Sequence, residues 1–213
     1  MKKAAVLLIV LAIAAACGMN MMPSKDRWYT EHYFIMQNYE RDIYRSLTDA
    51  GKLEFQKVFW EARPAEVKQE YDKRLTYISQ NFKKENFEQP WNTDRARVYL
   101  LNGNPASIEQ HVNDNWTMQI KIGQGGTGFE SADGRTGEDV GATTLEVWTY
   151  NYQNQFVYYG FVFQPPSKWK QVQISAGAYR YMGELENWSK TVTYGVINEA
   201  QYKQKLEELK AIK

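Results

Sequence analysis

The sequence predicts an α+β fold, with N-terminal helices packed on a mainly antiparallel β-sheet and a closing C-terminal helix. Apolar residues recur every three or four positions through the first half of the chain. The second half holds short β-branched and aromatic runs bounded by Gly, Pro or Asn. Helices followed by mostly consecutive strands favour antiparallel pairing within one sheet.

The helical half begins with a stripe of four-residue spacing formed by Ile35, Tyr39, Ile43 and Leu47. Thr48 is a suitable N-cap for the next helix. The strongest periodicity predicts an amphipathic helix over about 65–83. Its apolar side is formed by Val67, Tyr71, Leu75, Ile78 and Phe82.

The sheet half begins, on this interpretation, with a strand in which Val98 and Leu100 alternate with Arg97, Tyr99 and Leu101. Further strands are expected in the runs TTLEVWTY, FVYYGFVF, KQVQISAG and TVTYGVI. Asn198 is a good N-cap for a closing helix that extends to about residue 212.

The N-terminus is typical of a bacterial lipoprotein. Lys2 and Lys3 precede thirteen uncharged residues, Ala4–Ala16, too few to span a bilayer as a helix. The chain's single cysteine, Cys17, follows three alanines, as in a lipobox. We therefore expect cleavage before Cys17 and its acylation, palmitate included. Gly18, where an aspartate would favour inner-membrane retention, favours the outer membrane.

The net charge of the chain argues against nucleic acid as a partner, and its length suits a single domain. Removing the signal segment 1–16 changes the formal charge from +1 to −1. A nearly neutral chain has no general attraction for nucleic acid. We expect a lipidated tether over 17–26 and a single domain over 27–213.

That domain is expected to have a helical part, 27–88, a sheet part, 89–197, and a C-terminal helix, 198–213. A flexible loop is expected at 123–141, which holds seven glycines. Its GQGGTG run matches a dinucleotide fingerprint but lacks the following helix, so no nucleotide or other cofactor is expected.

No metal site or catalytic set is recognisable. Carboxylates in the glycine-rich segment lack EF-hand spacing, and His32 and His111 are the only histidines. The chain has no nucleophile elbow. The sequence favours a non-enzymatic role, although a spatial pair of carboxylates would leave no signature.

The segment QPWNTDRARVYLLNGNP, 89–105, has two open interpretations. Trp91 can wedge between helix and sheet, Thr93 and Asp94 can fix a turn, and Arg95 and Arg97 would share one face of a strand. That makes an architectural junction. Alternatively, the same side chains line a charged recognition groove beside Trp91.

This segment resembles the signature of GWxTD-domain proteins, G-W-x-T-D-R-G-R-[IV]-Y-[IL]-x-Y-G-x-P. The matching positions are Trp91, Thr93, Asp94, Arg95, Arg97, Tyr99, Gly103 and Pro105. The similarity extends over about 47–164. Pro90 and Ala96 replace two glycines of the pattern, and the acid expected before Pro64 is missing.

The resemblance implies a secreted or lipid-anchored bacterial protein without an established activity. We therefore expect an outer-membrane lipoprotein that binds a protein partner in an envelope assembly through its aromatic sheet or glycine-rich loop. The alternatives are a glycan-directed hydrolase and a glycan-binding lipoprotein, the latter with Trp148 or Trp169 as stacking platforms.

Overall fold

The computed structural model describes residues 26–112, 144–172, 174 and 178–212. The chain divides into two compact units, Met1–Tyr33 and Phe34–Lys213. In the first unit the description covers helix α2 (Arg27–His32), whose N-terminus is capped by Asp26. The second unit carries the rest of the fold.

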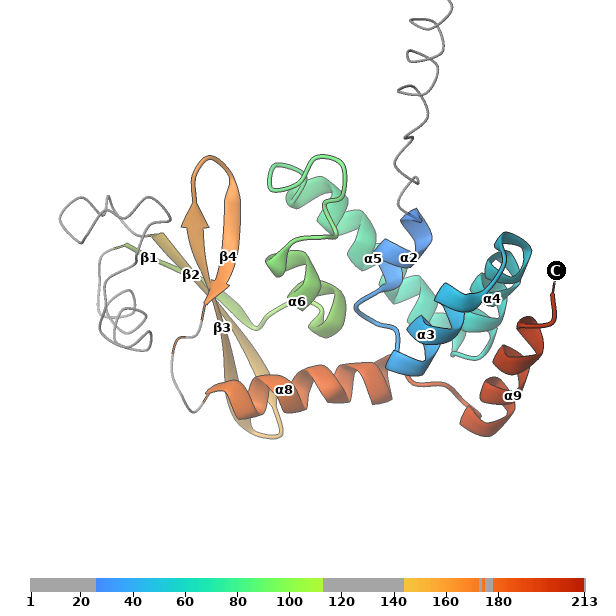
Figure 1. Ribbon diagram of the computed structural model, residues 1–213. Helices are drawn as coiled ribbons and strands as arrows, with labels where there is room; N and C mark the ends of the chain where they lie inside the picture. The colour runs from blue at the N-terminus through green and yellow to red at the C-terminus, as the bar shows by residue number, and fades with distance from the viewer. Residues whose placement is uncertain (1–25, 113–143, 173, 175–177, 213) are drawn as a thin grey trace, which may run out of the picture. The chain divides into compact units, whose positions relative to one another are not determined.

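The second unit is α+β, as the sequence predicted (Figure 1). Helices α3 (Asn38–Ser46), α4 (Asp49–Glu61) and α5 (Ala65–Asn81) come first. The predicted cap is confirmed, since the Thr48 hydroxyl accepts a hydrogen bond from the N–H of Gly51. The predicted helix over 65–83 is α5, and its Tyr71 and Ile78 are fully buried.

The sheet has the strand order β1–β2–β3–β4, with every neighbouring pair antiparallel. Its strands are β1 (Ser107–Val112), β2 (Thr144–Tyr152), β3 (Gln155–Gln164) and β4 (Lys168–Val172). Gln153 and Asn154 have φ values of 48° and 61°. Two successive positive φ values suit a tight hairpin whose twist matches that of the strands, here β2 and β3.

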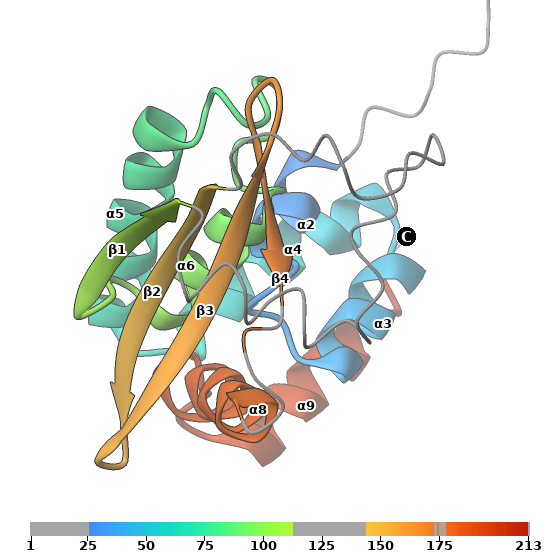
Figure 2. The same ribbon diagram turned by 90° about the vertical axis from the view of Figure 1, so that its left-hand side faces the viewer.

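The helices of this unit lie on one side of the sheet (Figures 1 and 2). On that side Trp148 packs against Phe82 and Phe161, with ring centroids 6.0 and 5.0 Å apart. The opposite face carries a second apolar cluster, formed by Leu145, Val147, Val162, Val172 and Ile174. The central strands β2 and β3 therefore bury apolar side chains on both faces of the sheet.

The C-terminal part differs from the expected strand. The run TVTYGVI was predicted to be a strand, and this is wrong. A helix, α8 (Ala178–Trp188), continues into a π-helical turn, η1 (Ser189–Thr193), where the N–H of Tyr194 donates to the carbonyl of Ser189 at 2.9 Å. The predicted closing helix is α9 (Glu199–Leu209), and Asn198 caps it by accepting from the N–H of Gln201.

Candidate functional site

The segment 89–105 forms a helix, α6 (Asp94–Asn102), and the predicted strand at Arg97–Leu101 is therefore wrong. Thr93 is its N-cap and accepts from the N–H of Ala96 at 3.2 Å. Most of α6 is buried: Ala96, Val98, Tyr99, Leu100 and Leu101. A helix that is apolar on nearly all sides shows no amphipathic period in its sequence. The consecutive apolar residues of α6 therefore resemble those of a buried strand.

Asp94 connects the first turn of α6 to strand β4. Its Oδ2 accepts from the backbone N–H of Gln171 at 2.8 Å and lies 3.1 Å from Nζ of Lys170. Lys170 is 62% exposed, so the ion pair is screened and the backbone hydrogen bond is the stronger constraint. A carboxylate in the first turn also interacts favourably with the helix dipole.

Arg95 joins two buried carboxylates. Its guanidinium lies 2.7 Å from Oε1 of Glu85 and 2.9 Å from Oε1 of Glu146, whose side chains are only 3% and 6% exposed. The guanidinium carbon also lies 4.8 Å from the ring centroids of Phe82 and Trp169. Burial raises the pKa of Glu85, and this outweighs the opposing effect of Arg95.

Arg97 points elsewhere, because two residues along an α-helix correspond to a rotation of about 200°. Its Nη1 donates to Oε1 of Glu186 on α8 at 2.9 Å, and its Nη2 to Oε1 of Gln171 on β4 at 2.6 Å. The expectation that Arg95 and Arg97 share one face is thus wrong. The two arginines tie α6 to different parts of the domain.

The last turn of α6 is held by Arg74 from α5. Its Nη1 donates to the carbonyls of Leu100 and Leu101 at 2.9 and 3.1 Å. Gly103 ends the helix with a φ of 76°, and a Cβ there would lie 2.7 Å from Nη2 of Arg74. Glycine is therefore required both for the backbone conformation and for the close approach of the guanidinium.

The remaining motif residues, Trp91, Tyr99 and Pro105, are also buried or partly buried within the domain. Trp91 is buried, with 5% exposure. The hydroxyl of Tyr99 donates to Oδ1 of Asn104 at 2.7 Å, and its ring stacks on Tyr77 at 4.5 Å. Pro105 is partly buried between α6 and β1.

The motif thus forms a helix with its two caps and its charged anchors. Asp94, Arg95 and Arg97 each contact partners within the domain. Within the ranges that the structure describes, no group of three or more His, Cys, Asp or Glu side chains could hold a metal ion. The geometry can fix α6 against α5, α8 and the sheet, and this favours the architectural interpretation over a charged groove.

Of the two tryptophans considered as glycan platforms, Trp148 is buried and Trp169 is partly buried. Trp148 is 1% exposed and donates its indole N–H to Glu146 at 2.6 Å, so this hypothesis is wrong for Trp148. Trp169 lies over Arg95 and packs against Phe163, with centroids 5.2 Å apart. Four aromatic residues of the sheet belong to the core: Trp148, Tyr150, Tyr159 and Phe161.

Several sequence-based predictions fall outside the described residues: Cys17 with its tether, and the glycine-rich segment 123–141.

Both histidines lie in the described part of the chain. Nε2 of His111 is 3.7 Å from Oε2 of Glu109, and Nδ1 of His32 is 2.8 Å from the carbonyl oxygen of Trp28. Over the parts of the chain described, no helix combines the length and apolarity needed to cross a membrane.

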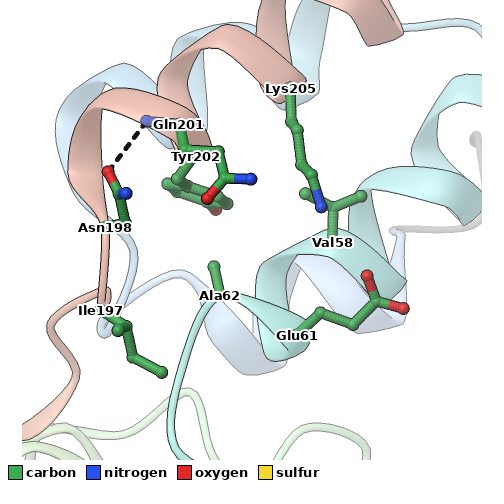
Figure 3. Close-up of a pocket in the computed structure, with 8 residues that line it drawn as sticks. All are labelled: Val58, Glu61, Ala62, Ile197, Asn198, Gln201, Tyr202 and Lys205. Atoms are coloured by element: carbon green, nitrogen blue, oxygen red, sulfur yellow. Dashed lines mark hydrogen bonds between the residues drawn. The ribbon is translucent and has the colours of Figure 1, made fainter.

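A small pocket of about 200 Å³ lies between α4 and α9 (Figure 3). Val58, Glu61 and Ala62 line it from α4 or its end, and Asn198, Gln201 and Tyr202 line it from the start of α9. This volume is below the range of about 300–1,000 Å³ that is usual for small-molecule sites. The Tyr202 hydroxyl is already bonded to buried Glu40 at 2.8 Å.

Comparisons with protein-family models, curated proteins and solved structures found no match for this chain.

Proposed function

We propose that this protein is a non-enzymatic, lipid-anchored component of the bacterial cell envelope, similar to GWxTD-domain proteins, that binds another envelope protein. The basic start, the short apolar segment and Cys17 support lipid anchoring. Gly18 supports an outer-membrane destination.

The observation that carries the non-enzymatic part of the proposal is the internal use of the motif's charges. Asp94 is held by a backbone N–H, Arg95 by two buried carboxylates, and Arg97 by Glu186 and Gln171. A general acid or base must reach a substrate proton within hydrogen-bonding distance. Side chains that fix α6 to its neighbours serve that architecture instead.

The surface best suited to a protein partner is strand β1. It is the end strand of the described sheet, and Ile108 and Val112 are 50% and 55% exposed on the same face of the strand. A strand at a sheet edge can pair with an extended segment of another chain, and exposed apolar side chains add specificity. Glu109 and Gln110 between them keep the strand polar enough to limit self-association.

Site-specific cross-linking tests this function. A photoreactive benzophenone amino acid at Ile108 of the full-length protein should give one discrete adduct in native envelopes. The matched control is the same residue at Leu53 on α4, which is 62% exposed and should give none. Absence of an adduct at 108, or equal labelling from both positions, would contradict the partner surface.

The lipid anchor has a separate test. Mass spectrometry of the mature N-terminus should find a polypeptide that begins at acylated Cys17. Cys17→Ala should abolish the acylation and release the protein from the membrane fraction. An unmodified N-terminus on a membrane-associated chain would contradict the anchor and leave the partner surface to be judged by cross-linking.

A further inference from the structure

A pocket of about 630 Å³ opens at the C-terminal end of α6. Its wall is formed by the end of α6, the end of β2 with the following hairpin, and the junction of α8 with η1. The hairpin and α8 both lie at the lower side of Figures 1 and 2. The volume is in the range of about 300–1,000 Å³ that is usual for small-molecule sites.

A pair of aromatic side chains, the exposed Trp188 and the partly buried Tyr152, lines this pocket. Trp188 is 43% exposed, although it is large and apolar. Its ring centroid is 6.3 Å from that of Tyr152, at an angle of 61° between the ring planes. An indole supported by a second ring offers a flat apolar surface at modest cost in conformational entropy.

The polar lining consists mainly of uncharged groups: Asn102, Asn104, Asn151, Gln153, Ser189 and Thr193. Some of their hydrogen-bonding groups are used within the protein, since Oδ1 of Asn104 accepts from Tyr99 and Nε2 of Gln153 donates to Tyr152. A primary amide has two donors and two acceptor sites, so the amides of Asn104 and Gln153 can still form hydrogen bonds with a ligand.

Charge contributes little to this lining. None of the residues that line the pocket is acidic, and the single basic one is Arg74. The guanidinium of Arg74 already binds the carbonyls of Leu100 and Leu101 as well as Glu70. A ligand that carries net charge would therefore find no uncommitted counter-charge among these lining residues.

The frame of the pocket is fixed by the irregular backbone after α8. The π-helical turn η1 places Ser189 so that its hydroxyl donates to Oδ1 of Asn102 at 2.8 Å. The amide of Asn102 donates in turn to the hydroxyl of Tyr159 at 3.1 Å. Single π-helical turns within helices occur frequently at functional sites, where they re-aim side chains. Here the turn directly follows Trp188.

We propose that this pocket binds a neutral carbohydrate. The C–H faces of a sugar ring are flat and apolar and can stack on Trp188, whereas its hydroxyl groups can exchange hydrogen bonds with amides such as Asn151. The lack of a free counter-charge in the lining disfavours anionic ligands, and its polar amides disfavour acyl chains. This inference is independent of the protein partner proposed above.

The test is calorimetric titration of the full-length protein in detergent micelles with two neutral probes, the hexasaccharides of N-acetylglucosamine and of α-1,4-linked glucose. At least one should bind saturably, with a Kd below about 1 mM. Trp188→Ala removes the ring on which the sugar would stack, so it should raise Kd by about tenfold or more.

Three further variants keep the test decisive. Trp188→Phe retains an aromatic face and should bind within about threefold of the parent protein. Phe87→Ala removes a ring that is 75% exposed and does not line the pocket, so its affinity should be unchanged. Asn151→Ala, at an exposed position, should weaken binding even if Trp188→Ala fails to fold.

Saturable binding that is lost in Trp188→Ala and retained in Phe87→Ala would support the site. The proposal is overturned if neither hexasaccharide saturates the protein, or if the folded Trp188 and Asn151 variants bind as the parent does. These outcomes are distinct from those of cross-linking at Ile108, which reports only on the protein partner.

Discussion

Arg95 is the residue of the motif whose loss should cost most. It is 13% exposed and separates two buried carboxylates, Glu85 and Glu146. Breaking a buried ion pair by removing one partner costs about 3–5 kcal/mol, because an uncompensated charge remains buried. We expect Arg95→Ala to lower the free energy of unfolding by this amount, as measured by urea denaturation.

A surface ion pair provides the control for Arg95. Arg45 and Asp42 are 62% and 69% exposed, so Arg45→Ala should cost less than about 1 kcal/mol. An equal loss of stability in Arg95→Ala and Arg45→Ala would contradict the role of the buried ion pair.

The stability of Arg95→Ala should also depend on pH. Burial already raises the pKa of Glu85, and loss of Arg95 would raise it further. Protonation of Glu85 then favours the folded state, so Arg95→Ala should recover part of its stability between pH 7 and pH 5.

A partly buried lysine, Lys190, should change the stability of the protein with pH in the opposite direction to a buried carboxylate. Burial, and then the charge of Arg41, lowers the pKa of Lys190. The folded state therefore binds the proton of the Lys190 ammonium group less tightly than the unfolded state does. The charged side chain thus lowers the free energy of unfolding, and this cost is fully present at neutral pH. It is lost as pH rises from the folded pKa to the unfolded value of about 10.4.

Lys190→Met should therefore raise the free energy of unfolding at pH 7, and the gain should shrink towards pH 10.5. Urea denaturation at the two pH values measures the difference. Lys84→Met, at an exposed position, should change stability by less than about 0.5 kcal/mol at either pH. A gain for Lys190→Met that stays constant with pH would count against the buried-charge explanation.

At the scale of elements, the C-terminal end of α6 depends on Gly103. A side chain there would adopt a φ of 76° and would displace the guanidinium of Arg74 from the last carbonyls of the helix. We expect Gly103→Ala to destabilise the protein by about 1–3 kcal/mol in thermal or urea unfolding.

Gly183 in α8 is the matched control for Gly103. A Cβ at Gly183 would meet no atom within 4 Å, and an alanine in a helix interior is favoured over glycine by about 0.8–1.0 kcal/mol. Gly183→Ala should therefore stabilise the protein. Destabilisation of similar size at both positions would show that the conformation and the space around Gly103 are not the cause.

The elements that the sequence predicted correctly are those with a clear period or cap. Helix α5 has apolar residues three and four apart, β2 and β3 are β-rich runs with a turn between them, and α9 begins after Asn198. Helix α6 was mistaken for a strand because its apolar residues face all directions. Its local signal was Thr93 followed by Asp94, an N-cap before an acidic first turn.

Helix α8 was missed for a related reason. Met182, Leu185 and Ser189 are buried with helical spacing, but Gly183 and the surrounding aromatic residues weaken the pattern. Trp188 and the pocket beside it were missed with it. The carboxylates that hold the motif arginines could not be found by spacing either, because Glu146 lies 51 residues from Arg95 and Glu186 lies 89 residues from Arg97.

At the scale of the whole second unit, a hydrogen-bond network around a buried ion pair connects the helices that lie farthest apart in sequence. Glu40 on α3 is fully buried, and its Oε1 is 2.7 Å from Nη2 of Arg63 after α4. The same oxygen accepts from Tyr202 on α9 at 2.8 Å, and Nε of Arg63 donates to the carbonyl of Tyr194 after η1. One network thus connects the first and last helices of this unit.

We expect this network to make the helical part unfold as one cooperative unit. Arg63→Met should cost about 3–5 kcal/mol, because Glu40 would remain buried without its ion-pair partner. The double variant Glu40→Leu with Arg63→Met should cost less than the sum of the two single variants, since it removes both charges together. Coincident unfolding curves from fluorescence and far-UV circular dichroism would establish that a two-state comparison is valid. Additive costs would mean that Glu40 and Arg63 act independently, which would contradict a coupled network.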